Sequence, residues 1–142
     1  MFNKLLQRLK ALLPVAAGKL SEEKTGRQDI GRWAEDQAKI FLVQQGLTLR
    51  DRNYRCKSGE IDLIMQDKQS LVFVEVRSRN NTDFGSALES VTQTKQRRLI
   101  RAAQHYLQKQ RLLDKLPCRF DVVSVDRTRD IKWIPNAFSA FG

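Results

Sequence analysis

The sequence has few of the residues on which several common kinds of site depend. It holds one histidine, His105, and two cysteines, Cys56 and Cys118, among 142 residues. These numbers exclude a zinc site built on several histidines, a histidine-metal nuclease motif and a disulfide scaffold. A Ser-His-Asp relay would have to use His105, and no Gly-x-Ser-x-Gly turn accompanies it. Two thiols suit a reducing compartment, so we expect a cytoplasmic protein.

Long apolar runs and phosphate-binding loops are missing as well. No run approaches the roughly 20 apolar residues of a membrane span, and the chain has no P-loop, no Gly-x-Gly-x-x-Gly and no Cys-x-x-Cys. Residues 1–13 have the pattern of a basic amphipathic helix that ends before Pro14. Such a helix can lie on a membrane, but we favour an arm that packs on the domain or on a partner.

Positive charge is what the sequence has in excess. Its 26 Lys and Arg outnumber 16 Asp and Glu, which gives a formal net charge of +10. This balance favours a polyanionic partner, nucleic acid before membrane. Hydrophobic residues make up 41%, enough for the core of one domain. We expect an N-terminal helix and linker over residues 1–25, a domain over 26–134 and a tail over 135–142.

Two apolar runs, residues 61–65 and 71–76, are separated by a polar turn and predict a β-hairpin. Asp62 and Glu75 lie inside these runs, although acids are depleted in strands and rarely buried without a partner. Arg77 shares a strand face with Glu75, because side chains alternate along a strand. The two acids have two interpretations: ligands of Mg²⁺ or Mn²⁺, which take oxygen donors, or members of ordinary ion pairs with nearby arginines.

The flanking segments predict helices and further strands. Asp29 is a candidate N-cap for a helix that runs to about Gln45 and is closed by Gly46, with Glu35 near the edge of its apolar face. A strand over residues 47–50 would complete a three-stranded antiparallel meander with the hairpin. The remaining expected elements are a helix over 86–110, a strand over 119–125 with Asp121 at its start or on a sheet edge in a structural role, and a short strand over 131–134.

The expected helix over 86–110 has an apolar stripe and a basic side. Residues 77–111 contain eight Lys or Arg and two acids. Such a side is either a solvated helix face or a track for a phosphate backbone. The candidate nucleic-acid contacts are Arg79, Arg97, Arg98 and Arg101.

Several motifs together resemble the YraN-like family of bacterial proteins. They are Gly59-Glu60-Ile61-Asp62, Val74-Glu75-Val76-Arg77, Phe120-Asp121-Val122-Val123 and the segments around Glu35 and Tyr54. The resemblance covers roughly residues 26–125. That family is similar to the restriction-endonuclease-like superfamily, which includes Holliday junction resolvases.

This resemblance implies an α/β fold, in which a mixed sheet (an antiparallel meander plus a further strand) is flanked by helices. It also implies an Asp…Glu-x-Lys metal site. Asp62 and Glu75 would be the ligands of Mg²⁺ or Mn²⁺, and Glu35 a further ligand or a water-positioning acid. Arg77 stands where the superfamily most often has Lys, and Arg cannot act as a base. Lys95 or Lys57 would then have to supply the missing lysine.

The leading hypothesis is a metal-dependent endonuclease that acts on structured or branched DNA, with catalytic candidates Glu35, Asp62, Glu75, Arg77 and Lys95. One alternative is a nucleic-acid-binding module without catalysis. Another is a protein that binds a partner or a membrane through its N-terminal helix. Relatives of this fold that cut branched DNA also suggest a homodimer, which the sequence leaves open.

Overall fold

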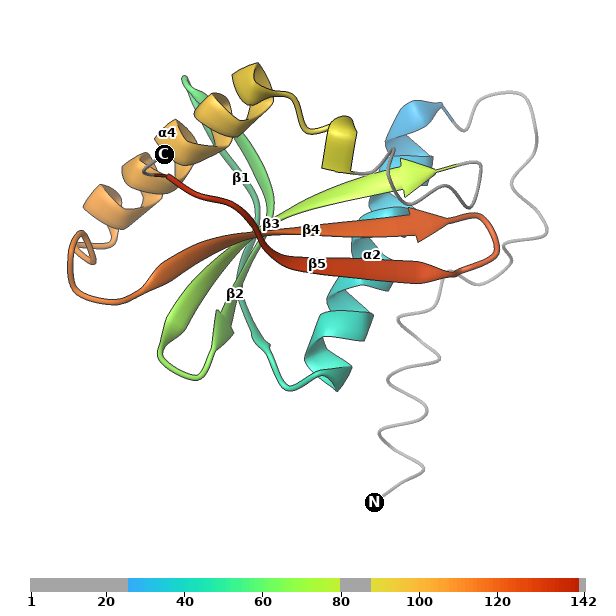
Figure 1. Cartoon of the computed structure of the whole chain (residues 1–142), viewed down its shortest axis with the longest axis horizontal. Coiled ribbons are helices and arrows are strands. Elements are labelled where there is room, and N and C mark those ends of the chain that lie inside the picture. Colours follow the sequence, from blue (N-terminus) through green and yellow to red (C-terminus); the bar gives the residue numbers. More distant parts are fainter. Residues whose placement is uncertain (1–25, 80–87, 141–142) are drawn as a thin grey trace.

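Five strands form one mixed sheet, and one helix lies against each face of that sheet (Figure 1). The computed structural model of the protein describes residues 26–79 and 88–140. The strand order is β1-β2-β3-β4-β5, with β3 and β4 parallel and the other neighbours antiparallel. The elements are α2 (Arg27–Gln44), β1 (Thr48–Cys56), β2 (Gly59–Asp67), β3 (Ser70–Arg79), α4 (Gln93–Lys109), β4 (Cys118–Asp126) and β5 (Ile131–Phe138).

The predicted hairpin is confirmed as β2 and β3. These strands pair in antiparallel register from Asp67 and Ser70 to Leu63 and Val74, and Lys68 takes a positive φ of 56° in the tight turn. β1 pairs with β2, so the three-stranded meander is confirmed too. The expected helix at residues 1–13, the linker that follows it, and residues 80–87 and 141–142 lie outside the described part of the chain.

Alternating side chains of β3 divide the core between the two helices. Val72 and Val74 point toward α2, whose predicted apolar face buries Ala34, Ala38 and Leu42. Leu71 and Phe73 point the other way, toward α4. The predicted stripe of α4 is buried there and consists of Leu99, Ala102, Ala103, Tyr106 and Leu107.

The expected start of each helix is wrong. Gly26, not Asp29, is the N-cap of α2, and no side chain caps this end. The helix expected over 86–110 is interrupted, because α4 begins only at Gln93. Thr92 caps it by accepting a hydrogen bond from the Lys95 backbone N–H at 3.3 Å, the usual role of a β-branched hydroxyl residue at this position.

β1 and β5 extend well beyond the short strands expected over residues 47–50 and 131–134. β1 continues through Cys56, and a bulge between Leu49 and Asp51 breaks the alternation that would have revealed it. β5 extends beyond residue 134 to Phe138, because Pro135 is tolerated on an edge strand. The remaining correction concerns Asp121, which lies on the interior strand β4 and not on an edge.

The expected fold class is confirmed: the molecule is α/β, and its mixed sheet with two flanking helices has the architecture of the restriction-endonuclease-like fold. α4 connects the parallel strands β3 and β4, as a crossover between parallel strands requires. In the part of the chain that the structure describes, no helix is long and apolar enough to cross a membrane.

Candidate functional site

The two acids of the hairpin lie where β2 and β3 separate. Pairing between these strands ends at Leu63 and Val74, whereas β3 remains paired with β4 as far as Arg79. Figure 1 shows β1 and β2 leaving this point in one direction and the end of β3 in another. Asp62 and Glu75 are the next residues beyond the last pair, so they lie at the opening of the fork.

Glu75 is buried and Asp62 is half-buried beside it, and together they form an electrostatically unfavourable pair. The Glu75 side chain is only 5% exposed. Burial, and then the negative charge of Glu75, raise the pKa of Asp62 well above its ordinary value of 3.8. A hydrogen bond of 2.8 Å from the Val76 backbone N–H to Asp62 Oδ2 acts in the opposite direction. Two carboxyl groups held in this way attract a cation.

Two basic side chains reach Glu75 from different elements. Lys95 Nζ, from the first turn of α4, lies 2.6 Å from Glu75 Oε1. Arg77 Nη1, from β3, lies 3.5 Å from the same oxygen. Arg77 is also fixed by a 2.9 Å hydrogen bond from its Nε to Ser90 Oγ. We call Asp62, Glu75, Arg77 and Lys95 the fork cluster.

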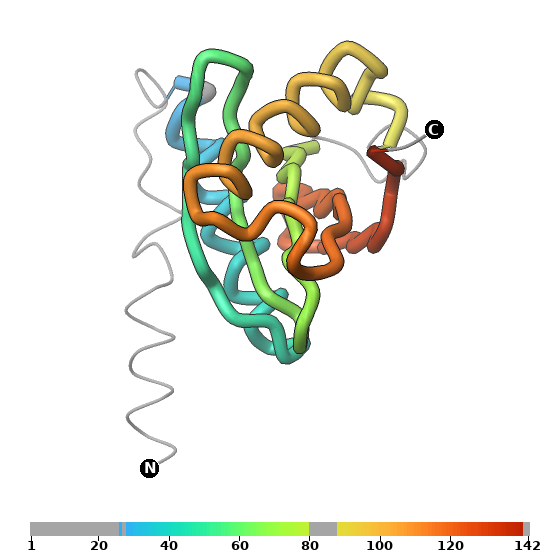
Figure 2. The backbone as a smooth tube through the Cα atoms, turned by 90° about the vertical axis from the view of Figure 1, so that its left-hand side faces the viewer, coloured from blue at the N-terminus to red at the C-terminus, as the bar shows by residue number. Residues whose placement is uncertain are grey.

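Close packing of α4 on the β1–β2 hairpin places Lys95 in this cluster. Figures 1 and 2 show α4 running beside the β1–β2 hairpin. At Gly59 a Cβ atom would lie 3.3 Å from the carbonyl oxygen of Arg98, tighter than most real Cβ contacts. Glycine therefore permits this approach. The Thr92 cap fixes where the helix begins, and hence where Lys95 projects.

Glu35 lies near the fork cluster but has a partner of its own. Its side chain is 14% exposed, and Arg52 Nη2 lies 3.5 Å from Glu35 Oε2. The same guanidinium binds Asp36 more closely, at 2.6 Å. Burial raises the pKa of Glu35, while the charge of Arg52 lowers it. The negative charge of Glu35 also contributes to the raised pKa of Asp62, so the two acids interact at a distance.

The acids present suit a hard divalent cation that keeps part of its own hydration. Within residues 26–79 and 88–140, no group of three or more acids, histidines or cysteines forms a metal cage. The structure therefore brings Asp62 and Glu75 together but leaves Glu35 outside their pair. Mg²⁺ and Mn²⁺ fit such a pair, since one or two carboxylates suffice when water and phosphate oxygens complete the shell. Glu35 Oε2 is buried, and its contact with Arg52 at 3.5 Å is long, so this oxygen could supply a further acceptor.

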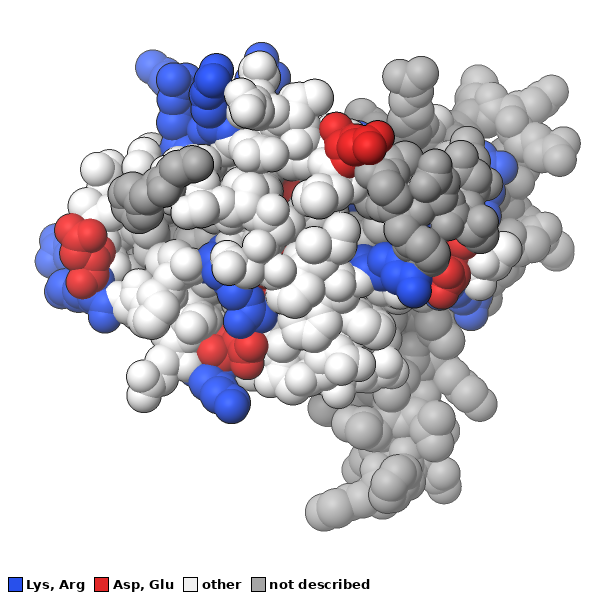
Figure 3. All heavy atoms as spheres, in the orientation of Figure 1, with Lys and Arg blue, Asp and Glu red and all other residues white. Residues whose placement is uncertain are grey.

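The expected nucleic-acid contacts divide into two groups. Arg97, Arg98 and Arg101 are exposed on α4. Figure 3 shows Lys and Arg side chains gathered at one corner of the molecule, over the β1–β2 turn and α4. Arg79 is different, because it is buried at the end of β3, where it pairs in register with Asp126. This burial argues against Arg79 as a surface contact for a phosphate.

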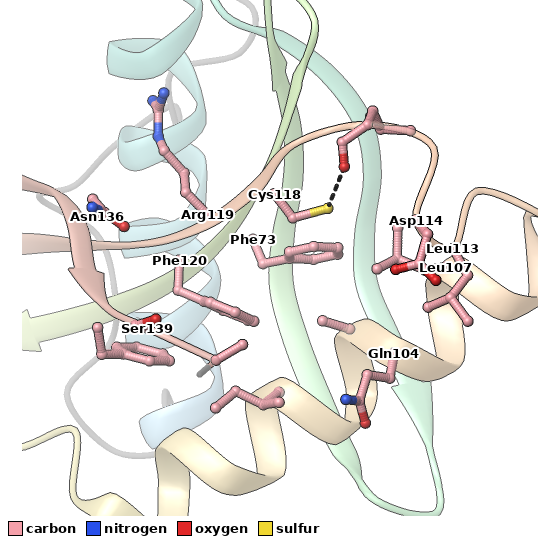
Figure 4. A pocket seen from close by; sticks show the side chains of 15 residues that line it. Phe73, Gln104, Leu107, Leu113, Asp114, Cys118, Arg119, Phe120, Asn136 and Ser139 are labelled. Atoms are coloured by element: carbon pink, nitrogen blue, oxygen red, sulfur yellow. Dashed lines mark hydrogen bonds between the residues drawn. The ribbon is translucent and has the colours of Figure 1, made fainter. Parts of the chain in front are cut away.

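An apolar pocket of about 240 Å³ lies on the α4 side of the sheet (Figure 4). Phe73 and Phe120 form one wall of this pocket, and Leu107 lies opposite on α4. The pocket adjoins the C-terminal half of α4, whereas Lys95 lies near the N-terminal end of the helix. It therefore does not include the fork cluster.

Sequence reasoning missed two residues that position the site. Ser90 holds the Arg77 guanidinium, and Arg52 holds Glu35 and Asp36. Nothing in the sequence marks either residue, because Ser90 and Arg52 each bind side chains from a different element. Lys95 was expected only as a substitute, and Lys57, the other substitute, is exposed in the β1–β2 turn.

Comparison with known proteins gives the family. The model of the uncharacterised protein family UPF0102 matches residues 34–125. The chain belongs to this family. The match covers the part of α2 that holds Glu35, the fork cluster and nearly all of β4, and it agrees with the YraN-like resemblance of the sequence.

Relatives in several bacteria cover most of the chain. A UPF0102 protein of Nitrosomonas eutropha is 56% identical over 108 residues, which are 76% of this chain and 91% of the relative. One from Hahella chejuensis is 53% identical over 115 residues, 80% of this chain and 92% of the relative. A Legionella pneumophila member is 49% identical over 114 residues, 80% of this chain and 97% of the relative. These similarities establish the family but do not identify an activity.

Proposed function

We propose that the protein is a metal-dependent endonuclease that acts on structured or branched DNA in the cytoplasm. The observation that carries the proposal is the position of Lys95. It places an ammonium 2.6 Å from Glu75, next to the Asp62 carboxyl group. The fork cluster thus combines two carboxylates with a lysine, although the strand position two residues after Glu75 holds Arg77.

The residues divide the chemistry of phosphodiester hydrolysis among them. Asp62 and Glu75 would hold Mg²⁺ or Mn²⁺, which supplies charge stabilisation and an activated water. Arg77, already anchored by Ser90, is suited to bind a phosphate oxygen, since a guanidinium forms charged hydrogen bonds without losing its proton. Lys95 can orient the water or stabilise the pentavalent phosphate. Overall, the water oxygen bonds to phosphorus, the bond to the leaving oxygen breaks, and the proton that the water loses is balanced by the one that the leaving oxygen takes up.

A cleavage assay tests the catalytic claim. Branched, nicked and single-stranded DNA are incubated with Mn²⁺ and either the wild-type protein or Glu75→Gln. We expect at least a roughly hundredfold loss of rate in the variant, the scale for losing a charge-stabilising group. Glu60→Gln is the matched control, because Glu60 is an exposed acid of β2 that pairs with Arg55. Wild-type protein that cuts none of the substrates, or cleavage unchanged in Glu75→Gln, would refute the catalytic claim.

The exposed arginines of α4 support a second candidate, a nucleic-acid-binding module without catalysis. Arg97, Arg98 and Arg101 lie on the same helix as Lys95, so a phosphate backbone bound there would approach the fork cluster. Replacing all three by Glu should weaken DNA binding strongly at low salt and flatten its dependence on salt concentration.

The control carries the same change of charge at the other end of the sheet, at the exposed residues Arg127, Arg129 and Lys132. Equal affinity of the α4 variant and this control, measured by fluorescence anisotropy, would count against the α4 surface. Metal-independent binding without cleavage would favour the module over the nuclease.

A further inference from the structure

Lys95 and Arg77 both contact Glu75, but they are held differently. Arg77 is tied to Ser90 by its Nε, and its side chain is 30% exposed. Lys95 has the shorter contact, 2.6 Å, on a side chain that is 37% exposed. A lysine has four rotatable bonds and a strongly hydrated ammonium. Because Arg77 is anchored to Ser90 as well, Lys95 is the cation of the two that can leave Glu75 more easily.

We propose that Lys95 is a built-in counter-ion that a divalent cation must displace from Glu75. This inference rests on the proposed function, because it assumes that Asp62 and Glu75 are the ligands. Glu75 is 5% exposed, so it needs a positive partner in the folded protein. The Lys95 ammonium contacts Glu75 Oε1, so it would compete with a cation for this carboxylate.

Displacement gives Lys95 two successive roles. While it neutralises Glu75, it stabilises the fold and opposes the binding of a cation. Once it leaves Glu75, its ammonium remains at the mouth of the fork, where a phosphate would arrive. The tether to α4 keeps it there, since the Thr92 cap fixes the start of the helix. Lys95 therefore links occupation of the metal site to delivery of a positive charge toward the substrate.

If Lys95 has both roles, one substitution should strengthen metal binding and weaken DNA cleavage. Lys95→Met keeps most of the side-chain volume but removes the competing charge. It should bind Mn²⁺ more tightly than the wild type, by about fivefold, the equivalent of one partly exposed ion pair. DNA cleavage should fall at the same time. A residue that only supported the fold or only bound the substrate would not tighten metal binding.

Isothermal titration of Mn²⁺ into the full chain measures this effect, with thermal unfolding as a second readout. Lys95→Met should be less stable without Mn²⁺ and should gain more in melting temperature when Mn²⁺ is added. Lys95→Arg keeps the competing charge and should bind Mn²⁺ no more tightly than the wild type. Lys109→Met is the matched control, because it removes an exposed lysine from the last turn of the same helix.

The outcomes separate this inference from the proposed function. Tighter binding in Lys95→Met alone supports displacement. Unchanged or weaker Mn²⁺ binding in a folded Lys95→Met, with binding abolished in Glu75→Gln, overturns displacement and leaves the metal site in place. If neither the wild type nor Lys95→Met binds Mn²⁺, both the inference and the metal-dependent function fail.

Discussion

Asp62 and Asp121 are acids in apolar strands of the same sheet, yet their surroundings differ. Asp121 is fully buried, and its carboxylate accepts hydrogen bonds from Arg119 Nε at 3.1 Å, from Trp133 Nε1 at 2.8 Å and from the Asn136 backbone N–H at 2.9 Å. Asp62 accepts a hydrogen bond from the Val76 backbone N–H and lies beside another acid. Donors surround one carboxylate, and burial beside a like charge destabilises the other.

The number of donors around each carboxylate distinguishes an acid that stabilises the fold from an acid that belongs to a binding site. A fully paired carboxylate has its charge compensated inside the protein, so it fixes the position of its neighbours. A carboxyl group whose pKa is raised by burial and by a like charge stores unfavourable energy that a bound cation would relieve. We therefore assign Asp121 to the anchoring of β5 and Asp62 to the fork cluster.

The largest expected effect on stability is that of Asp121→Asn. It removes the charge that faces Arg119, and the new amide NH₂ cannot accept from the donors on the oxygen that it replaces, so we expect a loss of about 3 kcal/mol in the free energy of unfolding. Urea unfolding followed by tryptophan fluorescence measures it. Asp67→Asn is the control, because Asp67 also binds Arg119, at 3.0 Å, but is 31% exposed. If Asp121→Asn loses no more stability than Asp67→Asn, then Asp121 is not the structural acid that we contrast with Asp62.

A smaller effect of opposite sign is expected for Asp62→Asn. Folding raises the pKa of Asp62 above 3.8, so the folded chain holds this proton more tightly than the unfolded chain. The carboxyl group favours the folded state at low pH, and this contribution is lost as the pH rises from about 4 through the pKa of the folded protein. Asparagine does not titrate and can still accept the Val76 N–H.

Asp62→Asn should therefore be more stable than the wild type at pH 8, by about 1 kcal/mol, the usual gain from removing an unfavourable functional residue. The gain should shrink as the pH falls toward 4. Urea unfolding at a series of pH values tests this. A variant that is less stable than the wild type at pH 8 would show that Asp62, like Asp121, is a structural acid.

Local periodicity predicted the hairpin and the apolar faces of both helices, whereas the fold class followed from the family resemblance. The sequence could not distinguish Asp62 from Asp121, because the partners that separate them come from other elements. Trp133 and Asn136 lie on β5, whose length was underestimated at Pro135. The same limit applies to the fork cluster, since only the packing of α4 near Gly59 shows which lysine reaches Glu75.

Nucleic-acid binding, the homodimer and the role of residues 1–25 remain predictions. The corner of basic side chains over α4 and the β1–β2 turn gives the first of them a defined surface (Figure 3). Because Arg79 is buried, the exposed basic surface consists of residues on α4 and in the β1–β2 turn. Mutations at Arg97, Arg98 and Arg101 therefore test a single continuous element.

The central claim is that Asp62 and Glu75 bind a divalent cation. The most direct test is a crystal structure of the full chain grown with Mn²⁺, with anomalous scattering to locate the ion. We predict an anomalous peak bonded to carboxylate oxygens of both residues, with Lys95 Nζ moved away from Glu75. Crystals at saturating Mn²⁺ that show no peak at the fork, and Lys95 still paired with Glu75, would contradict the account.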